Sequence, residues 1–341
     1  MKRFSKKEFT PKTSFTIVVP FRNEKENLPN LLHSISLLNY PIELVEIILV
    51  DDDSEEVFSV QDLVFSLKVI KNDRKSNSPK KDAIETAIQV AKNDWIITTD
   101  ADCLIQKDWL TTFDQYIQEN EVEMVASGVC YVPKSGFLSA FQNLDFLSLQ
   151  GATIGSFGIN QPFMCNGANF AYSKQFFKRL NGFQGNETIA SGDDVFLLQK
   201  AVSVAPKKVG FLLAKESIVA TKPVKTWNEL FQQRVRWASK STGYSSSYGK
   251  ILALAVFGGN LVWILSFLLW LTNVLDQNIF MLFVALKFLI DFILLYKTAN
   301  FFESKLKYVL ASSLLYSFFS VSVAVYSLFG NYSWKGRNFR K

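Results

Sequence analysis

The sequence predicts an α/β fold, a doubly wound sheet with helices on both faces, followed by helices that cross a membrane. Three observations support this prediction. Short apolar and β-branched runs alternate with helical patterns through the first hundred residues, which is the pattern of βαβ units in a parallel sheet. Two of the predicted strands end in aspartates. The last quarter of the 341-residue chain is dominated by Leu, Phe, Val and Ile.

The expected elements follow one another in the order that a βαβ fold requires. Strands are expected in the segments 14–20, 45–50, 67–73 and 95–99, and helices in the segments 27–38 and 80–94. The second helix is amphipathic, with an apolar face formed by Ala83, Ile84, Ala87, Ile88 and Ala91. Ligands of doubly wound sheets bind beyond the carboxyl ends of the strands. We therefore expect a site where the second and fourth strands end in aspartates.

The composition excludes several classes of protein. With 48% hydrophobic residues, 31 phenylalanines and a net charge of +6, the chain is too apolar to be disordered. Its three cysteines are widely spaced and form no disulfide framework or zinc-binding pair, and its single histidine, His33, lies in a predicted helix. No GxGxxG follows the first strand and no GxxxxGKS or GxxxxGKT occurs, which disfavours dinucleotide dehydrogenases and P-loop hydrolases.

Three apolar segments in the last quarter of the chain are long enough to cross a bilayer, which takes about 20 residues. They are expected at 251–272, 279–296 and 308–329, and they are apolar all round, which disfavours a buried helical bundle as the alternative. Lys287 and Asp291 lie four residues apart in the second segment, so we expect them to neutralise each other as an ion pair.

A fourth apolar pattern lies between the α/β region and these segments. Helical spacing there connects Phe137, Leu138, Phe141, Leu144 and Leu147. This spacing suits an interfacial helix at the membrane surface. The alternative is a helix that packs on the α/β core.

Asp100 and Asp102 flank one alanine at the end of the fourth predicted strand. Carboxylate oxygens are hard ligands that suit Mg²⁺ or Mn²⁺, and Mg²⁺ commonly takes one or two protein carboxylates with phosphates and water in its other positions. This pair can therefore hold a divalent metal beside a diphosphate. The alternative is two solvated loop acids, and the pair alone does not decide between them.

The second predicted strand ends in the acidic run VDDDSEE, at residues 50–56. The run lacks the spacing of an EF-hand calcium loop. An aspartate nucleophile of the phosphatase kind is a second interpretation. A carboxylate that holds the base or ribose of a nucleotide is the third, and it fits best beside another strand end that binds a metal.

A third acidic site is formed by Asp193 and Asp194, directly before a predicted helix. Acids at a helix N-terminus are stabilised by the helix dipole, so a simple cap is one interpretation. The other is a general base that takes a proton from an acceptor hydroxyl.

Gln233, Arg236 and Trp237 lie within two turns of a predicted helix just before the apolar segments. Arg can bind a diphosphate through two hydrogen bonds, and Trp can stack on a sugar or an acceptor. The alternative is an amphipathic helix at the membrane interface, where Arg and Trp are common, and both interpretations can hold together.

Taken in order, these motifs resemble the membrane-bound family 2 glycosyltransferases. The resemblance covers residues 14–240 and rests on the ordered set VVPFRNE, VDDDS, DAD, NGANFAYSKQFFKRLNGF, GDD and QRVRW. It implies the GT-A fold, a nucleotide-diphosphate sugar as donor, Mg²⁺ or Mn²⁺ as cofactor, and inversion of the anomeric configuration.

The resemblance also implies roles for individual residues on the donor side. Those expected beside the nucleotide are Pro20, Asn23, Glu24, Asp52 and Lys80. Asp102 is expected to hold the metal together with Asp100, which also faces the nucleotide or sugar. Asp53 departs from the family pattern, since it replaces the usual glycine.

On the acceptor side, the resemblance implies that Asp194 is the catalytic base. Asp193 replaces the family's usual glutamate, so Asp193 is the alternative base. Gln233, Arg236 and Trp237 match the QxxRW motif and are expected to bind the diphosphate and the acceptor end.

The acceptor is expected to be a membrane lipid or polyprenoid at the cytosolic leaflet. QxxRW is typical of processive synthases, but three helices are few for a polymer channel, and the ending YSWKGRNFRK resembles lipid-directed members. A processive polysaccharide synthase, with a glycan acceptor, is the alternative. A membrane-anchored protein that binds a sugar or nucleotide but has lost catalysis is disfavoured, because Asp102, Asp194 and Arg236 are all present. No nucleic-acid partner is expected.

We expect a multi-pass integral membrane protein with a cytoplasmic catalytic domain, in the inner membrane if the source is bacterial. The expected parts are a basic N-terminal tail without a secretory signal, a catalytic domain, transmembrane helices and a basic C-terminal tail, at 1–13, 14–248, 249–330 and 331–341. Three full crossings would place the C-terminal tail outside, against the positive-inside tendency, so the number of crossings stays open. The basic residues of that tail are Lys335, Arg337, Arg340 and Lys341.

Overall fold

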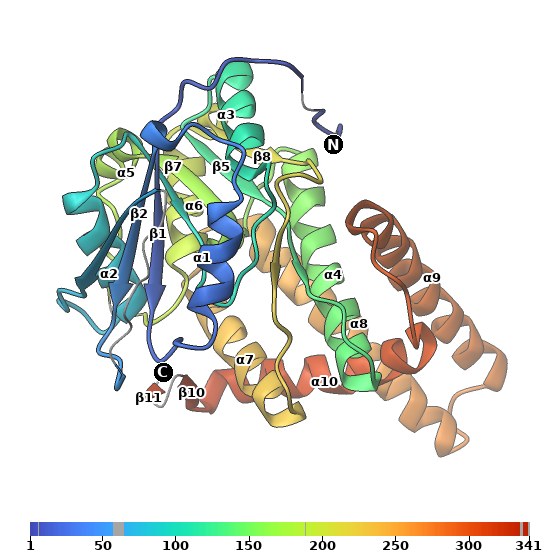
Figure 1. Ribbon diagram of the computed structural model, residues 1–341. Coiled ribbons are helices and arrows are strands. Elements are labelled where there is room, and N and C mark those ends of the chain that lie inside the picture. Colours follow the sequence, from blue (N-terminus) through green and yellow to red (C-terminus); the bar gives the residue numbers. More distant parts are fainter. Residues whose placement is uncertain (6, 57–64, 188, 335–336, 340–341) are drawn as a thin grey trace. The chain divides into compact units, whose positions relative to one another are not determined.

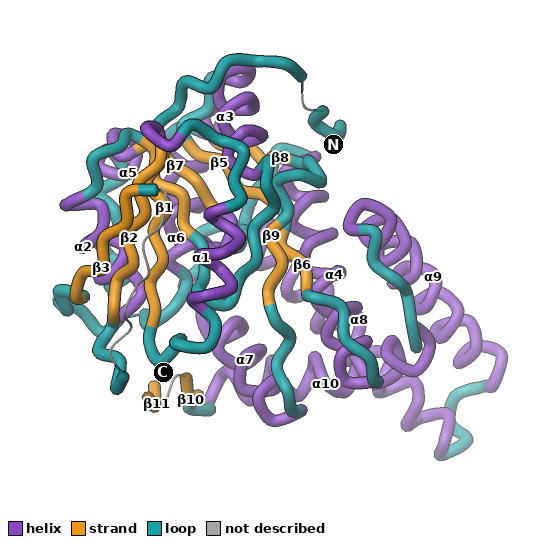
Figure 2. Tube along the Cα trace, in the orientation of Figure 1, coloured by secondary structure: helices purple, strands orange, loops and turns teal. Residues whose placement is uncertain are grey.

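The computed structural model describes residues 1–5, 7–56, 65–187, 189–334 and 337–339. The chain divides into two compact units. The first unit consists of Met1–Cys130 and Thr153–Lys222, and the second unit of Tyr131–Ala152 and Pro223–Lys341. Figure 1 traces the chain through both units, and Figure 2 separates its helices from its strands.

The first unit is built on a seven-stranded mixed sheet with the strand order β3-β2-β1-β4-β7-β5-β8. Its strands are β1 (Phe15–Phe21), β2 (Val45–Asp51), β3 (Ser66–Lys71), β4 (Trp95–Thr98), β5 (Met124–Ser127), β7 (Phe170–Ser173) and β8 (Val209–Leu212). β1 pairs in parallel with β2 and β4, and β2 pairs in parallel with β3, which confirms the four strands expected from the sequence. A separate two-stranded sheet pairs β6 (Val129–Tyr131) with β9 (Val219–Thr221).

The expectation of a parallel sheet is wrong for β7, which runs antiparallel to both β4 and β5. The chain leaves β4, passes through α3 (Trp109–Asn120) and forms β5 two positions away in the sheet. It then continues through α4 (Phe137–Gly158) before it forms β7. β7 therefore fills the gap between β4 and β5 from the opposite direction.

The other helices of the first unit connect the strands in two directions along the sheet. They are α1 (Leu28–Ser36), α2 (Pro79–Val90), α5 (Lys174–Arg179) and α6 (Asp193–Val204), with 3-10 turns at Ile42–Leu44, Gly167–Asn169 and Pro206–Lys208. The chain moves one way along the sheet from β1 through α1 to β2, and the other way from β3 through α2 to β4, so right-handed crossovers place α1 and α2 on opposite faces. The predicted apolar face of α2 is buried at all five positions, and His33 lies on α1, as predicted, with its side chain exposed.

The segment before β1 is hydrogen-bonded to the folded part of the first unit. The backbone N–H of Phe4 donates to the carbonyl of Leu213 at 2.9 Å. Further on, the N–H of Lys12 donates to the carboxylate of Asp114 at 2.9 Å, and Tyr40 donates its hydroxyl to the same carboxylate at 2.8 Å. Asp114 is fully buried on α3, so these bonds fix where the chain enters β1.

The second unit is helical and contains the apolar segments. Its elements, besides the first part of α4, are α7 (Trp227–Ser239), a 3-10 turn (Lys240–Gly243), α8 (Ser247–Leu271), α9 (Gln277–Phe302), α10 (Val309–Phe329), β10 (Tyr332–Trp334) and β11 (Arg337–Phe339). α8, α9 and α10 are each long and apolar enough to cross a membrane, as the sequence predicts. Of the basic C-terminal residues, Lys335, Arg340 and Lys341 lie outside the described residues.

The charged pair predicted within the second apolar segment is present on α9. Lys287 forms an ion pair with Asp291, one helical turn further on. The hydroxyl of Ser313 on α10 donates to the same carboxylate at 2.8 Å. The two charges thus compensate each other within a helix that is long enough to cross a membrane.

The apolar face of α4 packs within the second unit. The ring of Phe141 lies 5.1 Å from that of Trp227 on α7 and 5.2 Å from that of Phe319 on α10, between centroids. The ring of Phe137 lies 5.7 Å from that of Tyr308, the cap of α10. The predicted helical spacing is therefore correct, and its partners are α7 and α10.

Candidate active site

Charged side chains from three elements meet where the parallel strands of the first unit end. Lys80 comes from the first turn of α2, Asp100 from the loop after β4, and Asp193 from the first turn of α6. The ammonium of Lys80 lies 2.7 Å from Oδ1 of Asp100 and 3.6 Å from Oδ2 of Asp193. The Asp193 side chain is 9% exposed and that of Asp100 is 40% exposed, so the cluster opens to solvent at Asp100.

The charge of Lys80 is stabilised by these neighbours. Burial disfavours the ammonium form, but the carboxylates of Asp100 and Asp193 outweigh burial and raise the pKa of Lys80 above its usual value. Lys80 is therefore a permanent cation within an acidic cluster. Such a cation can bind an anionic group of a substrate.

Asp194 is oriented by the backbone. Its Oδ2 accepts a hydrogen bond from the N–H of Gly167 at 2.9 Å, and its Oδ1 accepts one from the N–H of Val195 at 2.7 Å. Both carboxylate oxygens are thereby fixed next to the cluster of Lys80 and Asp193.

Gly167 is a residue of the candidate site that no predicted role marks in the sequence. A Cβ at this position would lie 2.9 Å from Oδ2 of Asp193 and 3.4 Å from Nζ of Lys80. Glycine therefore leaves the space that these charged groups occupy. The signal in the sequence is the segment NGANF, which contributes to the family resemblance without an assigned role.

Asp102 lies two residues after Asp100, and its Oδ2 accepts a hydrogen bond from the hydroxyl of Thr221 at 3.2 Å. Burial, together with the negative charge of Asp100, raises the pKa of Asp102. No group of three or more His, Cys, Asp or Glu side chains placed to hold a metal occurs among the described residues. Two carboxylates leave the other positions of a divalent ion to phosphate and water, which is a donor set that suits Mg²⁺.

Asp52 is buried at the end of β2 and is bonded to side chains that follow β3. Its Oδ1 accepts a hydrogen bond from Nδ2 of Asn72 at 2.7 Å and lies 3.4 Å from the guanidinium of Arg74. Arg74 also lies 3.5 Å from the carboxylate of Asp82. No motif marks Asn72 or Arg74, so neither could be predicted as a partner of Asp52 from the sequence.

The loops after β1 and β2 are tied together at the same edge of the sheet. Asn23 and Asp53 adopt φ angles of 53° and 66°, in the left-handed region that favours glycine, which is the residue expected at the position of Asp53. The N–H of Glu55 donates to the side-chain oxygen of Asn23 at 2.9 Å. Pro20 lies within β1 and Glu24 in the loop that follows, so these predicted residues share one edge.

Comparison with known proteins identifies the family. Residues 16–180 match the profile described as Glycosyl transferase family 2. The chain carries a family 2 glycosyltransferase domain. It is therefore an enzyme of the glycosyltransferase class, as the ordered motifs predict. No curated protein matches the sequence.

Solved glycosyltransferase structures are similar at low sequence identity. The mannosyltransferase PcManGT from Pyrobaculum calidifontis, in complex with GDP-Man and Mn²⁺, aligns with a TM-score of 0.57 and 16% identity over 95% of this chain and 91% of that chain. Glucosyl-3-phosphoglycerate synthase from Mycobacterium tuberculosis aligns with a TM-score of 0.49 and 16% identity over 72% of this chain and 88% of that chain. S. aureus TarS aligns with a TM-score of 0.45 and 17% identity. The alignment covers 71% of this chain and 42% of the TarS chain. The similarity to PcManGT confirms the GT-A fold of this glycosyltransferase.

The predicted acceptor-side residues of the glycosyltransferase, Gln233, Arg236 and Trp237, all lie on α7 in the second unit. The buried arginine of this helix is Arg234, whose guanidinium pairs with Asp145 of α4. This pair could not be predicted from the sequence, because the helical pattern does not show which of two arginines points inward.

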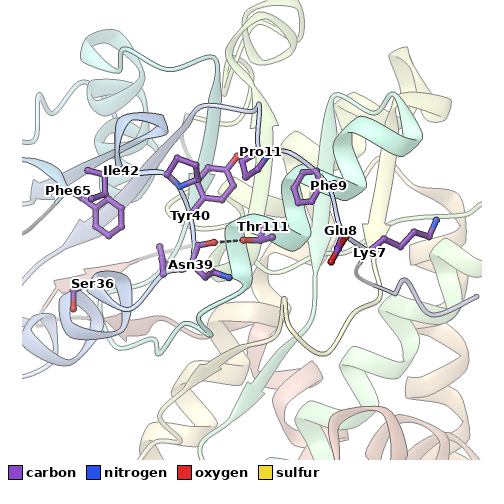
Figure 3. Close-up of a pocket in the computed structure, with 12 residues that line it drawn as sticks. Lys7, Glu8, Phe9, Pro11, Ser36, Asn39, Tyr40, Ile42, Phe65 and Thr111 are labelled. Carbon is purple, nitrogen blue, oxygen red and sulfur yellow. Dashed lines mark hydrogen bonds between the residues drawn. The ribbon is translucent and has the colours of Figure 1, made fainter.

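A cavity of about 780 Å³ lies at the opposite edge of the sheet in the first unit. Figure 3 shows its lining, which includes Phe9, Tyr40 and Phe65 from the segments that lead into β1, β2 and β3. The hydroxyl of Thr111 donates to the carbonyl of Asn39 at 2.6 Å in the same lining. The described lining contains none of the predicted site residues, so we assign the cavity no part in sugar transfer.

Proposed function

We propose that the glycosyltransferase moves one sugar from a nucleotide-diphosphate donor to a membrane lipid or polyprenoid at the cytosolic leaflet, with inversion at the anomeric carbon. The observation that carries this proposal is the cluster of Lys80, Asp100 and Asp193 beside the oriented carboxylate of Asp194. The cluster combines a cation for an anionic donor with carboxylates that can accept a proton.

In this proposal Asp194 takes the proton from the acceptor hydroxyl while the hydroxyl oxygen attacks the anomeric carbon. The bond between that carbon and the diphosphate breaks, and the nucleoside diphosphate leaves with the electron pair. The N–H groups of Gly167 and Val195 hold the carboxylate in one orientation for this transfer. Lys80 stabilises the negative charge of the departing diphosphate, and Asp193 is the alternative base.

We propose that Asp102, with Asp100, holds a divalent ion, Mg²⁺ or Mn²⁺. When bound, such an ion neutralises charge on the leaving diphosphate. The Mn²⁺ in the PcManGT complex, which shares the fold, supports this proposal. Because the ammonium of Lys80 already lies 2.7 Å from Asp100, Asp102 is the principal proposed ligand.

The remaining predicted residues complete the proposed substrate contacts. Pro20, Asn23, Glu24 and Asp52 lie in and after the strands that end at this edge, which supports a role beside the nucleotide. For Gln233, Arg236 and Trp237 the support is the QxxRW pattern on α7, and we propose that they bind the diphosphate and the acceptor end.

A lipid acceptor is supported by the three helices that are long enough to cross a membrane, α8, α9 and α10. These helices would hold the enzyme at the bilayer, where a lipid acceptor is concentrated, with the first unit in the cytoplasm. A processive polysaccharide synthase is the second candidate, because QxxRW is typical of such enzymes. Three helices in one chain are few for a channel that threads polymer.

The proposal is tested by comparing lipid extracts of cells that express the chain with extracts of cells that express an Asp194→Asn variant. Mass spectrometry is expected to show lipid species heavier by one sugar residue in the first extract alone. Identical lipid profiles, with new polysaccharide in the wild-type cells, would overturn the lipid acceptor in favour of the second candidate.

A further inference from the structure

Helix α7 carries a buried ion pair within its QxxRW motif. Nε of Arg234 lies 2.5 Å from Oδ2 of Asp145 on α4, and the two side chains are 6% and 5% exposed. The hydroxyl of Tyr131 lies 3.4 Å from the same guanidinium. A buried ion pair often adds no stability compared with apolar residues of the same volume, so its presence here calls for a second explanation.

Arg234 contacts two of the three residues that define the motif. Its guanidinium lies over the indole of Trp237, 4.2 Å from the ring centroid, which is cation–π geometry. The same guanidinium donates a hydrogen bond to Oε1 of Gln233. The ring of Phe146, next to Asp145 on α4, lies 6.1 Å from the ring of Trp237.

Helical geometry separates the two arginines of α7. Residues three apart lie on one face of a helix, so Arg234 can reach Trp237 and stack on it. Residues two apart do not share a face, so Arg236 points in another direction from Arg234. Arg236 is partly exposed, whereas Arg234 is buried against α4. The arginine that the motif names and the arginine that pairs with Asp145 are therefore different residues.

We propose that Asp145 and Arg234 are positioning residues that fix the orientations of Trp237 and Gln233 for binding the acceptor. Asp145 fixes the guanidinium, and the guanidinium in turn holds the indole by stacking and the amide by a hydrogen bond. The inference rests on the role proposed above for the motif.

The test uses a variant that removes both charges together, Asp145→Asn with Arg234→Gln. Removing one partner would leave an uncompensated buried charge and endanger folding, whereas the double change avoids this. The matched control is Glu123→Gln with Arg179→Gln, an ion pair of 2.8 Å in the first unit that is partly exposed, with the two side chains 22% and 46% accessible.

The first readout is the fluorescence of Trp237, which does not depend on activity. The difference in emission between a protein and its Trp237→Phe derivative isolates this indole from the other six tryptophans. The double variant is expected to shift that difference spectrum to longer wavelength, because the released indole meets water, while the control pair leaves it unchanged. An unchanged spectrum in the double variant would overturn the proposal.

The second readout is the KM for acceptor and for donor, measured with the nucleotide sugar and the lipid extract that yield product. The double variant is expected to raise the acceptor KM about tenfold and to leave the donor KM unchanged. In a Trp237→Phe background the same double change should raise the acceptor KM by a smaller factor than in the wild type, because the part of its effect that acts through the indole is already lost.

Two kinetic outcomes would count against the inference in different ways. If the double change raises the acceptor KM by the same factor in the Trp237→Phe background as in the wild type, the positioning role is overturned. The proposed function would stay intact. Wild-type kinetics for Trp237→Phe alone would instead contradict the role proposed for the motif, and the inference with it.

Discussion

The ammonium of Lys80 joins two carboxylates, at 2.7 Å from Asp100 and 3.6 Å from Asp193, and so connects the end of β4 to the start of α6. The next residue, Lys81, points into the protein and is 1% exposed. Its ammonium donates to two backbone carbonyls in the loop before α6, at 2.6 Å and 2.9 Å. Two adjacent lysines therefore have different tasks, one in the candidate site and one in supporting the loop that leads to it.

Exchange of each lysine for methionine should separate these tasks. Lys80→Met is expected to lower transfer about 100-fold, because the cation that faces the donor is lost. Lys81→Met is expected to lower the free energy of unfolding by about 1–3 kcal/mol, because two backbone carbonyls lose their charged donor. Activity assays and thermal unfolding of the purified variants measure both quantities. A stable, fully active Lys80→Met variant would contradict the role of this cation.

Asp194→Asn is expected to reduce transfer by about 10²–10⁴-fold, the range for loss of a general base. The amide keeps the size of the side chain but cannot accept the proton, and it turns an NH₂ group toward one of two backbone N–H donors. Binding of nucleoside diphosphate to the variant, measured by calorimetry, should stay close to that of the wild type. If Asp193→Asn is the inactive variant and Asp194→Asn is active, the base is Asp193.

Gly167→Ala tests how closely the charged cluster packs. The new methyl group would lie 2.9 Å from Oδ2 of Asp193, so this carboxylate must move, and we expect about a tenfold loss of transfer. Gly155→Ala is the matched control, because no atom lies within 4 Å of its added Cβ. Initial rates of the two variants, compared at equal folded fraction, check the prediction. Equal rates for both variants would show that the space beside Gly167 is not critical.

The strands that carry the site could be predicted because their signals are local. Apolar runs that end in acids mark β2 and β4, and the spacing of α2 shows which of its residues are buried. The direction of β7 could not be predicted, because it depends on where the chain returns to the sheet after α4. Pattern alone leaves that path undetermined.

The predicted site residues were found by motif, whereas their partners depend on side-chain direction. Neighbouring residues on a helix point about 100° apart, so the sequence does not show that Lys80 reaches Asp100 while Lys81 turns inward. The same limit applies to Arg234 and Arg236 on α7. Gly167 was missed for another reason, since the demand for glycine comes from Asp193, which approaches it only in the folded chain.

Removal of divalent ions tests the role of Asp102. An excess of EDTA is expected to abolish transfer, and added Mn²⁺ or Mg²⁺ to restore it, because the leaving diphosphate then regains its counter-charge. Asp102→Ala should weaken the binding of nucleoside diphosphate in the presence of metal and change it little in the presence of EDTA, as calorimetry would show. Full activity in excess EDTA would contradict a metal at this pair.

Phase partition of the product tests most directly whether this glycosyltransferase adds a single sugar to a lipid, as we propose. The purified protein in lipid nanodiscs is incubated with membrane lipid extract and a panel of nucleotide sugars labelled in the sugar. We expect one donor to give a discrete, organic-soluble product with one sugar per lipid, and the Asp194→Asn variant to give none. A ladder of growing chain lengths in the aqueous or insoluble fraction would contradict single transfer.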